Sequence, residues 1–277
     1  GGCQFNDKML RWELMKIKYY YLIQIQYLGF RYHGWLKQPG LKTIESMVNK
    51  TLGFILGPGN YKIMGTSRTD SKVSAHHSAF ELFTKSPLDM DSFFTKLNLN
   101  LHNDIRALEI KAVDNTFNII HSPRVKEYVY LFSFGEKCHP FSAPLISSFQ
   151  DHLDIASMKQ GAHLFLGTHD FRRYCTKPGP DTQFQRTILV SQIEENTLFS
   201  ASFFPKRSYA YRIQSKGFMR NQVRLIMGQL LSLGRGEIGL ADIEGSLTGK
   251  GRGPLRHIAP ASGLILNKIE FGESISR

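Results

Sequence analysis

The amino-acid sequence is constrained most by the alternation of two hydrophobic periodicities along its length. Residues 17–28 place apolar side chains at every second position, which predicts a half-buried β-strand. A segment with helical spacing follows, formed by Ile44, Met47, Val48, Leu52 and Ile55. Thr43 can cap this helix, and Gly57 ends it. A chain that alternates strands with helices in this way is typical of an α+β protein.

The predicted elements fall into two halves of similar organisation. In the N-terminal half, 16–113, we expect strands over 17–28, 61–64, 78–83 and 104–113 and helices over 44–55 and 91–97. In the C-terminal half, 124–277, we expect strands over 128–132, 187–194, 208–213 and 263–269 and helices over 155–165 and 223–231. Each half is therefore predicted to form a sheet with flanking helices, and the boundary lies near residues 114–124.

The sequence is strongly basic. It holds 35 Lys and Arg against 23 Asp and Glu, which gives a net charge of +12 over 277 residues. Because neutralised phosphates release condensed counterions, we expect such a protein to bind polyanions, nucleic acid before an acidic membrane surface. Many basic proteins bind no nucleic acid, so charge alone leaves a structural role open. The apolar content of 42% excludes disordered and fibrous proteins.

Cysteine usage and hydropathy indicate the cytoplasm. Cys3, Cys138 and Cys175 form no CxxC pair and are too few for a disulfide framework. The apolar stretch 19–28 is shorter than the ~20 residues of a membrane helix, and the residues before it do not suit a presequence. We therefore expect a cytoplasmic protein without a membrane span.

A turn over residues 65–73 carries the first candidate for chemistry. Small and polar residues surround Asp70, and we expect the neighbouring Arg68 guanidinium to favour the charged carboxylate. An ionised, exposed carboxylate can act as a nucleophile or as a general base. Taken alone, the pattern is more typical of an ordinary β-turn aspartate.

Two arginines and two tyrosines are further candidates. Arg220 and Arg224 are four residues apart, so we expect both to project from the same side of a helix. Arg224 lies in the most apolar part of that helix, where an unpaired charge is costly, and should therefore have a partner, whereas Arg220 also suits a solvated surface. Tyr128 and Tyr130 share one strand face, so one can stack on an exposed base while the other packs in the core.

Basic residues in the predicted loops are suited to follow a phosphate backbone. Those that we expect to contact RNA are Arg31, Lys72, Arg172, Arg173 and Arg220. Further basic loop residues, which also suit an ordinary surface, are Lys37, Lys177, Lys206, Arg207, Arg252 and Arg256. His76-His77 and Cys138-His139 lack ligand-spaced partners, and the sequence has neither a P-loop nor a GxGxxG motif. We therefore expect no metal and no nucleotide cofactor.

Several segments together resemble the tRNA pseudouridine synthase A (TruA) family over residues 17–272. The matching segments, in the family's order, are Tyr32-His33-Gly34-Trp35 with Gln38 and Thr43-Ile44-Glu45, Arg68-Thr69-Asp70, Gly167-Thr168-His169-Asp170-Phe171, Val223-Arg224 with Ile226 and Gly228, Gly234-Arg235-Gly236, and Ala259-Pro260-Ala261 with Gly263, Leu264 and Leu266. The family's RTD motif falls on residues 68–70. One short motif is unspecific, whereas this series in order is specific.

The resemblance implies two ferredoxin-like halves that form one mixed, mostly antiparallel sheet with flanking helices and a central basic cleft. It implies isomerisation of uridine to pseudouridine in the anticodon stem-loop of tRNA, among positions 38, 39 and 40, by a homodimer without cofactor or metal. It also implies that Asp70 is the catalytic aspartate, that Tyr128 stacks on the target base and that Arg224 pairs with Asp70. Arg68 and Leu264 are expected to bind the substrate.

The chain departs from the family pattern beside the aspartate. Lys72 and Ser74 replace a glycine and a histidine of RTDAGVHA, so a positive φ at residue 72 would strain the lysine or remodel the turn. Ile120 stands where an arginine is common, and Lys126-Glu127 replaces a more basic pair. The alternative function is an RNA-binding or tRNA-folding module with an altered catalytic turn.

Overall fold

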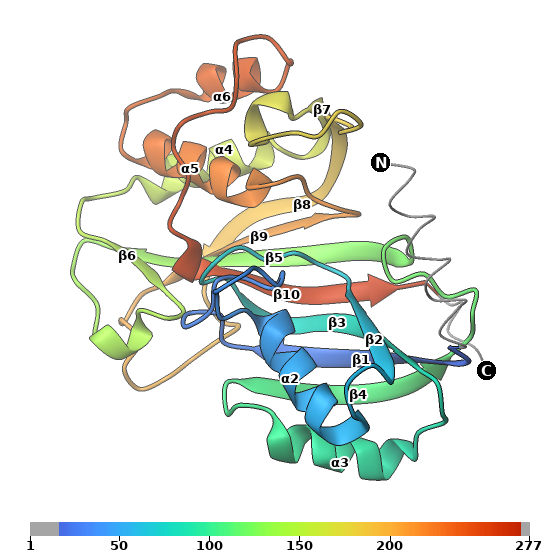
Figure 1. Cartoon of the computed structure of the whole chain (residues 1–277). Helices are drawn as coiled ribbons and strands as arrows, with labels where there is room; N and C mark the ends of the chain where they lie inside the picture. Colours follow the sequence, from blue (N-terminus) through green and yellow to red (C-terminus); the bar gives the residue numbers. More distant parts are fainter. Residues whose placement is uncertain (1–16, 273–277) are drawn as a thin grey trace. The chain divides into compact units, whose positions relative to one another are not determined.

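The computed structural model describes residues 17–272, which pack into two compact units (Figure 1). The first unit comprises residues 17–71, 75–123 and 271–272, and the second comprises 72–74 and 124–270. Residue 16 and residues 273–277, which belong to the two predicted halves, lie outside the described residues. No helix of the described part is both long enough and apolar enough to cross a bilayer.

The first unit is built on antiparallel strands and two helices. Its elements are β1 (Tyr19–Tyr27), α2 (Ile44–Leu56), β2 (Tyr61–Gly65), β3 (Ser74–Thr84), α3 (Met90–Asn100) and β4 (Ile105–Val113). β1 lies between β3 and β4, and β2 pairs with β3. The helices α2 and α3 pack against each other (Figure 1). β3 begins before the predicted strand 78–83, because Ala75 continues the ladder opposite Tyr27.

The helix α2 begins and ends at the predicted signals. The side chain of Thr43 accepts the N–H of Ser46 at 3.2 Å, and the Ser46 hydroxyl oxygen accepts the N–H of Thr43 at 3.0 Å. This reciprocal cap satisfies two donors that a helix start would otherwise leave open. Gly57 follows the last turn with φ of +83°. The prediction of this helix is confirmed.

The strand β1 is more buried than its alternating pattern predicts. Ile23 and Ile25 are buried and Gln24 stays partly exposed, as the alternation predicts. Leu22 lies on the same face as Gln24 and is nevertheless 1% exposed. The connection 114–122 explains the difference, because its apolar side chains pack with Leu22 in one cluster.

Glu81 of β3 lies on this same apolar face. It stands opposite Leu22 of β1 and Met64 of β2 in the ladders, and it is 2% exposed. Its Oε2 atom has no hydrogen-bond partner among the described residues. Burial raises the pKa of the Glu81 carboxyl group to about 8, so at neutral pH the group is mostly protonated.

The second unit combines a longer series of strands with three α-helices. Its strands are β5 (Pro123–Phe134), β6 (Ser147–Phe149), β7 (Gly167–Asp170), β8 (Gln185–Glu195), β9 (Tyr209–Ser215) and β10 (Leu264–Phe271). Its helices are α4 (Ile155–His163), α5 (Gln222–Gly234) and α6 (Leu240–Ser246), with short 3₁₀ turns at Pro140–Ser142, Arg172–Tyr174 and Ala261–Gly263. The strand order is β10-β5-β9-β8-β7.

The strand pairing confirms the predicted α+β class. The pairs β5–β9, β9–β8 and β8–β7 are antiparallel, and β6 joins β5 in parallel, so the pairing is mixed and mostly antiparallel. The elements β6, β7 and α6 were not predicted. They contain 3, 4 and 7 residues, which is too short to show a periodicity.

The helices α4 and α5 pack closely against each other. A Cβ atom at Gly161 of α4 would overlap the side chain of Leu233 of α5, so the glycine allows the two helices to approach. Figure 1 shows α4, α5 and α6 gathered beside β8. Tyr130 of β5 is buried in the core that α4 and α5 share, and Tyr128 packs at the border of that core.

Candidate active site and RNA-binding residues

Asp70 lies in the turn that follows β2. The preceding residue, Thr69, is buried, and its carbonyl oxygen accepts the N–H of Trp35 at 3.1 Å. The Thr69 Oγ1 atom lies 2.7 Å from the hydroxyl oxygen of Tyr27, at the end of β1. Asp70 itself is partly exposed. The first unit therefore fixes the backbone of this turn next to a carboxylate that keeps some exposure.

Gly34 allows the chain to pack against this turn. Its φ is +80°, and a Cβ atom there would lie 2.6 Å from the carbonyl oxygen of Thr69. The carbonyl oxygen of Gly34 also accepts the N–H of Ile44, the first residue of α2, at 3.0 Å. The start of α2 and the Asp70 turn are thus held by the same short segment.

Arg68 lies two residues before Asp70 in this turn. Its side chain is exposed, and it forms no ion pair with Asp70 in the part of the chain that the structure describes. The expected effect of Arg68 on the Asp70 carboxylate stays a prediction.

Lys72 adopts the backbone conformation that favours glycine. Its φ is +68°, in the left-handed region that costs an L-residue energy. Of the two outcomes expected from the missing glycine, the strained lysine is therefore the one found. The next residue, Val73, is 1% exposed and packs in the apolar core of the second unit.

Tyr128 and Tyr130 of β5 have different surroundings. Tyr130 is fully buried, and its hydroxyl group donates to the carbonyl oxygen of Pro260 at 2.8 Å and lies 2.9 Å from Ser147 Oγ. Tyr128 stays partly exposed, and its ring meets the ring of Phe218 edge to face at a centroid distance of 5.3 Å. Tyr130 is the core residue of the pair, which leaves Tyr128 as the candidate for stacking.

Arg224 contacts the backbone of the segment that precedes β10. Its Nε atom donates to the carbonyl oxygen of Ala259 at 2.8 Å, and the Ala259 N–H donates to the carbonyl oxygen of Arg224 at 3.0 Å. A Cβ atom at Gly228 would overlap the carbonyl oxygen of His257, so the glycine lets this segment lie on α5. Ala259 thus supplies a backbone acceptor for Arg224, and the pairing of Arg224 with Asp70 stays a prediction.

Arg220 does not lie on α5. The helix begins at Gln222, and Asn221 before it has φ of +59°. The side-chain oxygen of Gln222 accepts the N–H of Met219 at 2.8 Å, and Asn221 Nδ2 donates to Thr176 Oγ1 at 2.8 Å. These contacts hold a left-handed turn in front of the helix. The expectation of two arginines on one helical face is therefore wrong.

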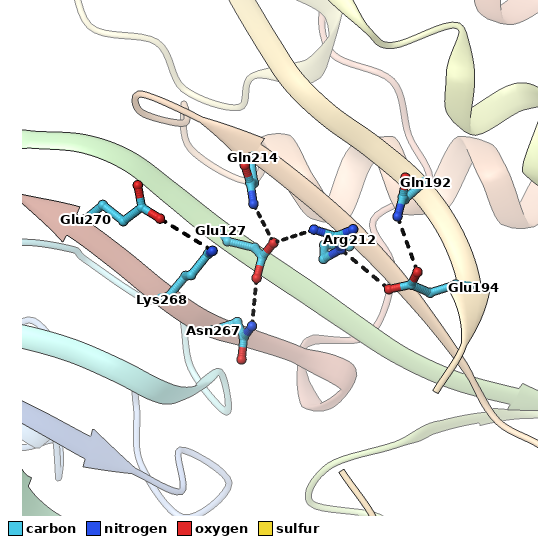
Figure 2. Close-up of polar contacts among 8 residues, drawn as sticks. All are labelled: Glu127, Gln192, Glu194, Arg212, Gln214, Asn267, Lys268 and Glu270. Atoms are coloured by element: carbon cyan, nitrogen blue, oxygen red, sulfur yellow. Dashed lines mark hydrogen bonds and ion pairs between the residues drawn. The ribbon is translucent and has the colours of Figure 1, made fainter. Parts of the chain in front are cut away.

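The buried carboxylate of Glu127 anchors β5 to its neighbouring strands (Figure 2). Because adjacent residues of a strand point to opposite faces, Glu127 lies on the face opposite Tyr128. Glu127 accepts hydrogen bonds from Gln214 Nε2 of β9 and Asn267 Nδ2 of β10, both at 2.7 Å, and lies 3.3 Å from Arg212 Nη1. Burial acts to raise the pKa of Glu127, but these hydrogen bonds outweigh it and hold the pKa below its usual range. Glu127 thus ties three neighbouring strands together beside Tyr128.

The arginines that are predicted to contact RNA differ in the contacts that their side chains already make within the protein. Arg31 is paired with Asp104 at 2.7 Å although its side chain is 55% exposed. Arg172 is exposed and lies over the ring of Phe184, 4.8 Å from its centroid. Arg173 is partly exposed, and its Nε atom is buried without a hydrogen-bond partner among residues 17–272.

The predicted site residues belong to both units. The first unit holds Arg31, Arg68 and Asp70, and the second holds Lys72, Tyr128, Arg172, Arg173, Arg220, Arg224 and Leu264. Leu264 is 5% exposed and belongs to the apolar cluster against which Tyr128 packs. The grouping of Asp70 with Tyr128 and Arg224 stays a prediction. Within the described residues, no three His, Cys, Asp or Glu side chains are arranged to hold a metal ion.

Comparison with known proteins gives consistent matches over most of the chain. A family model described as tRNA pseudouridine synthase matches residues 162–272. A tRNA pseudouridine synthase A from Exiguobacterium sibiricum is 30% identical, over 90% of this chain and 96% of the relative. The corresponding values are 30%, 89% and 97% for one from Clostridium kluyveri, and 28%, 89% and 97% for one from Thermodesulfovibrio yellowstonii. The chain belongs to the tRNA pseudouridine synthase A family.

Proposed function

We propose that this protein isomerises uridine to pseudouridine in tRNA and that Asp70 is its catalytic carboxylate. Family membership supports the reaction and the substrate class. The observation that carries the assignment of Asp70 is the turn itself: Thr69 is locked by Trp35 and Tyr27, while the next side chain keeps some exposure. A fixed backbone beside an accessible carboxylate is what a positioned catalytic group requires.

The reaction rearranges the substrate without adding or removing atoms. The bond between N1 of uracil and C1′ of ribose breaks, the base turns, C5 bonds to C1′, the C5 proton leaves and N1 gains a proton. An ionised Asp70 can attack C1′, remove the 2′ proton to give a glycal, or add to C6 of the base. Each route needs a uridine turned out of its stack, which costs a few kcal/mol.

The remaining site residues have roles that follow from their chemistry. Tyr128 stacks on the target base and offsets part of the cost of unstacking. Arg224 pairs with the Asp70 carboxylate, and Arg68 and Leu264 bind the substrate. Phosphates of the RNA are contacted by Arg31, Lys72, Arg172, Arg173 and Arg220. The protein acts as a cytoplasmic homodimer without cofactor, on uridines 38, 39 and 40 of the anticodon arm.

Site-resolved mapping of pseudouridine tests this proposal. Unmodified tRNA transcripts are incubated with wild-type protein, with Asp70→Asn and with Asp91→Asn, which removes an exposed carboxylate from the first turn of α3. Wild type and Asp91→Asn should modify the anticodon arm. Asp70→Asn should lose activity by ~10²–10⁴-fold or more and still bind tRNA, because the substitution keeps the shape of the side chain.

The same experiment addresses the alternative function. A wild-type protein that binds tRNA but modifies no transcript would identify an RNA-binding module with an altered catalytic turn, and the proposal would fail. Tyr128→Phe keeps the ring and Tyr128→Ala removes it. Equal activity of Tyr128→Ala and wild type would exclude the stacking role.

A further inference from the structure

An open hollow in the second unit is lined by basic residues. It has a volume of about 290 Å³ and lies between the loop after Tyr174 and the residues that lead into α5. Three cationic side chains line it, Lys177, Arg186 and Arg220, together with the carboxylate of Asp181. We call it the 177–220 hollow. Arg186 was not among the predicted site residues.

The walls of the 177–220 hollow are fixed by hydrogen bonds between segments distant in sequence. The N–H of Thr176 donates to the carbonyl oxygen of Arg220 at 3.2 Å. Asn221 Nδ2 donates to Thr176 Oγ1 at 2.8 Å, which closes the same junction with a side chain. Arg186 Nε donates to the carbonyl oxygen of Gln183 at 2.7 Å, so this guanidinium has a defined position.

Two further features concern the structure of the hollow: the backbone of its loop and the buried residue at its floor. Lys177 has φ of +46°, a backbone conformation that costs an L-residue energy. Cys175, which also lines the hollow, is 3% exposed. Burial raises the pKa of its thiol, while a backbone hydrogen bond from Arg220 and the charges of Arg186 and Arg220 act in the opposite direction. Both guanidinium groups are therefore electrostatically close to this floor.

The cations of the hollow outnumber the carboxylates of its lining. Over residues 17–272, Lys177, Arg186 and Arg220 form no ion pair with any carboxylate. Arg31, Arg212 and Arg235 in contrast are paired with Asp104, Glu127 and Asp151. Three cations against one carboxylate give the hollow a net charge of about +2, which an anionic ligand would neutralise.

We propose that the 177–220 hollow binds a phosphodiester group of the RNA substrate. Arginine forks hold phosphate oxygens in pairs, and a lysine adds a point charge beside them. Contacts of this kind position a nucleic acid without selecting its sequence. This inference rests on the proposed function, since it takes tRNA as the ligand, and it assigns Lys177 and Arg186 to the RNA interface together with Arg220.

The salt dependence of tRNA binding tests the inference. The dissociation constant of an unmodified transcript is measured over a series of salt concentrations for wild type, Lys177→Gln, Arg220→Gln and Asp181→Asn. Each lost cation should weaken binding about tenfold and reduce the slope of log affinity against log salt by about 0.7 to 1. Asp181→Asn should strengthen binding, because it removes the one repulsive charge of this lining.

Controls separate the hollow from general effects of charge and stability. Lys159→Gln removes an exposed cation from α4, outside the hollow, and should change the slope less than Lys177→Gln does. Unchanged slopes in both Lys177→Gln and Arg220→Gln, or weaker binding by Asp181→Asn, would overturn the inference. If inorganic phosphate binds wild type while tRNA affinity ignores both substitutions, the hollow is a site for free phosphate and the inference is likewise wrong.

The outcome is distinguishable from a failure of the proposed function. Pseudouridine formation by wild type reports on that function, whereas the slopes report only on contacts to phosphate. A protein that binds tRNA with the expected slopes but converts no uridine would support the hollow and refute the enzyme. A protein that converts uridine while both variants show unchanged slopes would support the enzyme and refute the hollow as a site for RNA phosphate.

Discussion

Replacing Glu81 by glutamine should change the free energy of unfolding by an amount that depends on pH, so that the variant gains stability relative to wild type as pH rises from 4.5 to about 8. The folded protein holds the pKa of Glu81 at about 8, against an ordinary value of 4.5, because the carboxyl group is buried among apolar side chains. Between these two pH values the unfolded chain releases a proton that the folded chain retains. The free energy of unfolding of wild type therefore falls as pH rises, by about 1.4 kcal/mol per pH unit from this group.

The difference between Glu81→Gln and wild type isolates that contribution. Below pH 4.5 the carboxyl group is protonated in both states and contributes no pH dependence. From 4.5 to about 8 the advantage of the variant should grow by about 5 kcal/mol in total, and above that pH it should stay constant. The buried amide of glutamine adds a constant penalty of ~1–3 kcal/mol, which shifts the curve without changing its slope.

Urea unfolding followed by circular dichroism, at half-unit steps from pH 5 to pH 8.5, measures this curve. Glu109→Gln is the matched control, because Glu109 is an exposed carboxylate of β4 in the same unit and its ion pair with Lys111 spans 3.4 Å at the surface. The control should differ from wild type by less than ~1 kcal/mol at every pH. A stability difference for Glu81→Gln that is flat between pH 5 and pH 8 would refute the argument from burial.

Three further substitutions test other parts of the structure by urea unfolding. Glu127→Ala should destabilise the fold by ~3–5 kcal/mol, because three donors lose a buried acceptor, and Glu127→Gln should cost less; equal losses would count against the carboxylate network. Gly228→Ala should cost ~1–3 kcal/mol through overlap with a backbone carbonyl oxygen, whereas Gly245→Ala in α6, with no atom within 4 Å, should be neutral or gain up to ~1 kcal/mol. Lys72→Gly should gain ~0.5–1 kcal/mol by relieving the positive φ, and Lys72→Ala, which keeps the strain, should gain nothing.

Elements with local signals were predictable from the sequence. The strand β1 and the helix α2 follow from alternation, from helical spacing and from the Thr43 cap, all of which lie within a few residues. The α+β class followed from the succession of such segments. The burial of Leu22 did not follow, because it depends on the connection 114–122, which is distant in sequence.

The surroundings of the candidate site residues could not be predicted from the sequence. The position of Arg220 was mispredicted because Asn221 bonds to Thr176 across 45 residues and turns the chain before α5 begins. Arg186 gave no signal, since an arginine at the start of a strand is usually only solvated. The contact of Thr69 with Tyr27 could not be predicted either, because neither local sequence pattern indicates that the two residues meet.

The way in which the Asp70 turn is held bears on how freely its sequence can vary. The carbonyl oxygen of Thr69 accepts a hydrogen bond from Trp35, so the backbone of the turn is held by the neighbouring segment. That segment requires a glycine at residue 34. Tolerance to substitution is therefore unequal. Residue 34 cannot accept a side chain, whereas residues 71 and 72 are exposed, and residue 72 is restricted by its positive φ. The turn can therefore keep its shape with Ser71 and Lys72 in place of the alanine and glycine of RTDAGVHA. Substitutions at residues 71 and 72 alone do not indicate that catalytic activity has been lost.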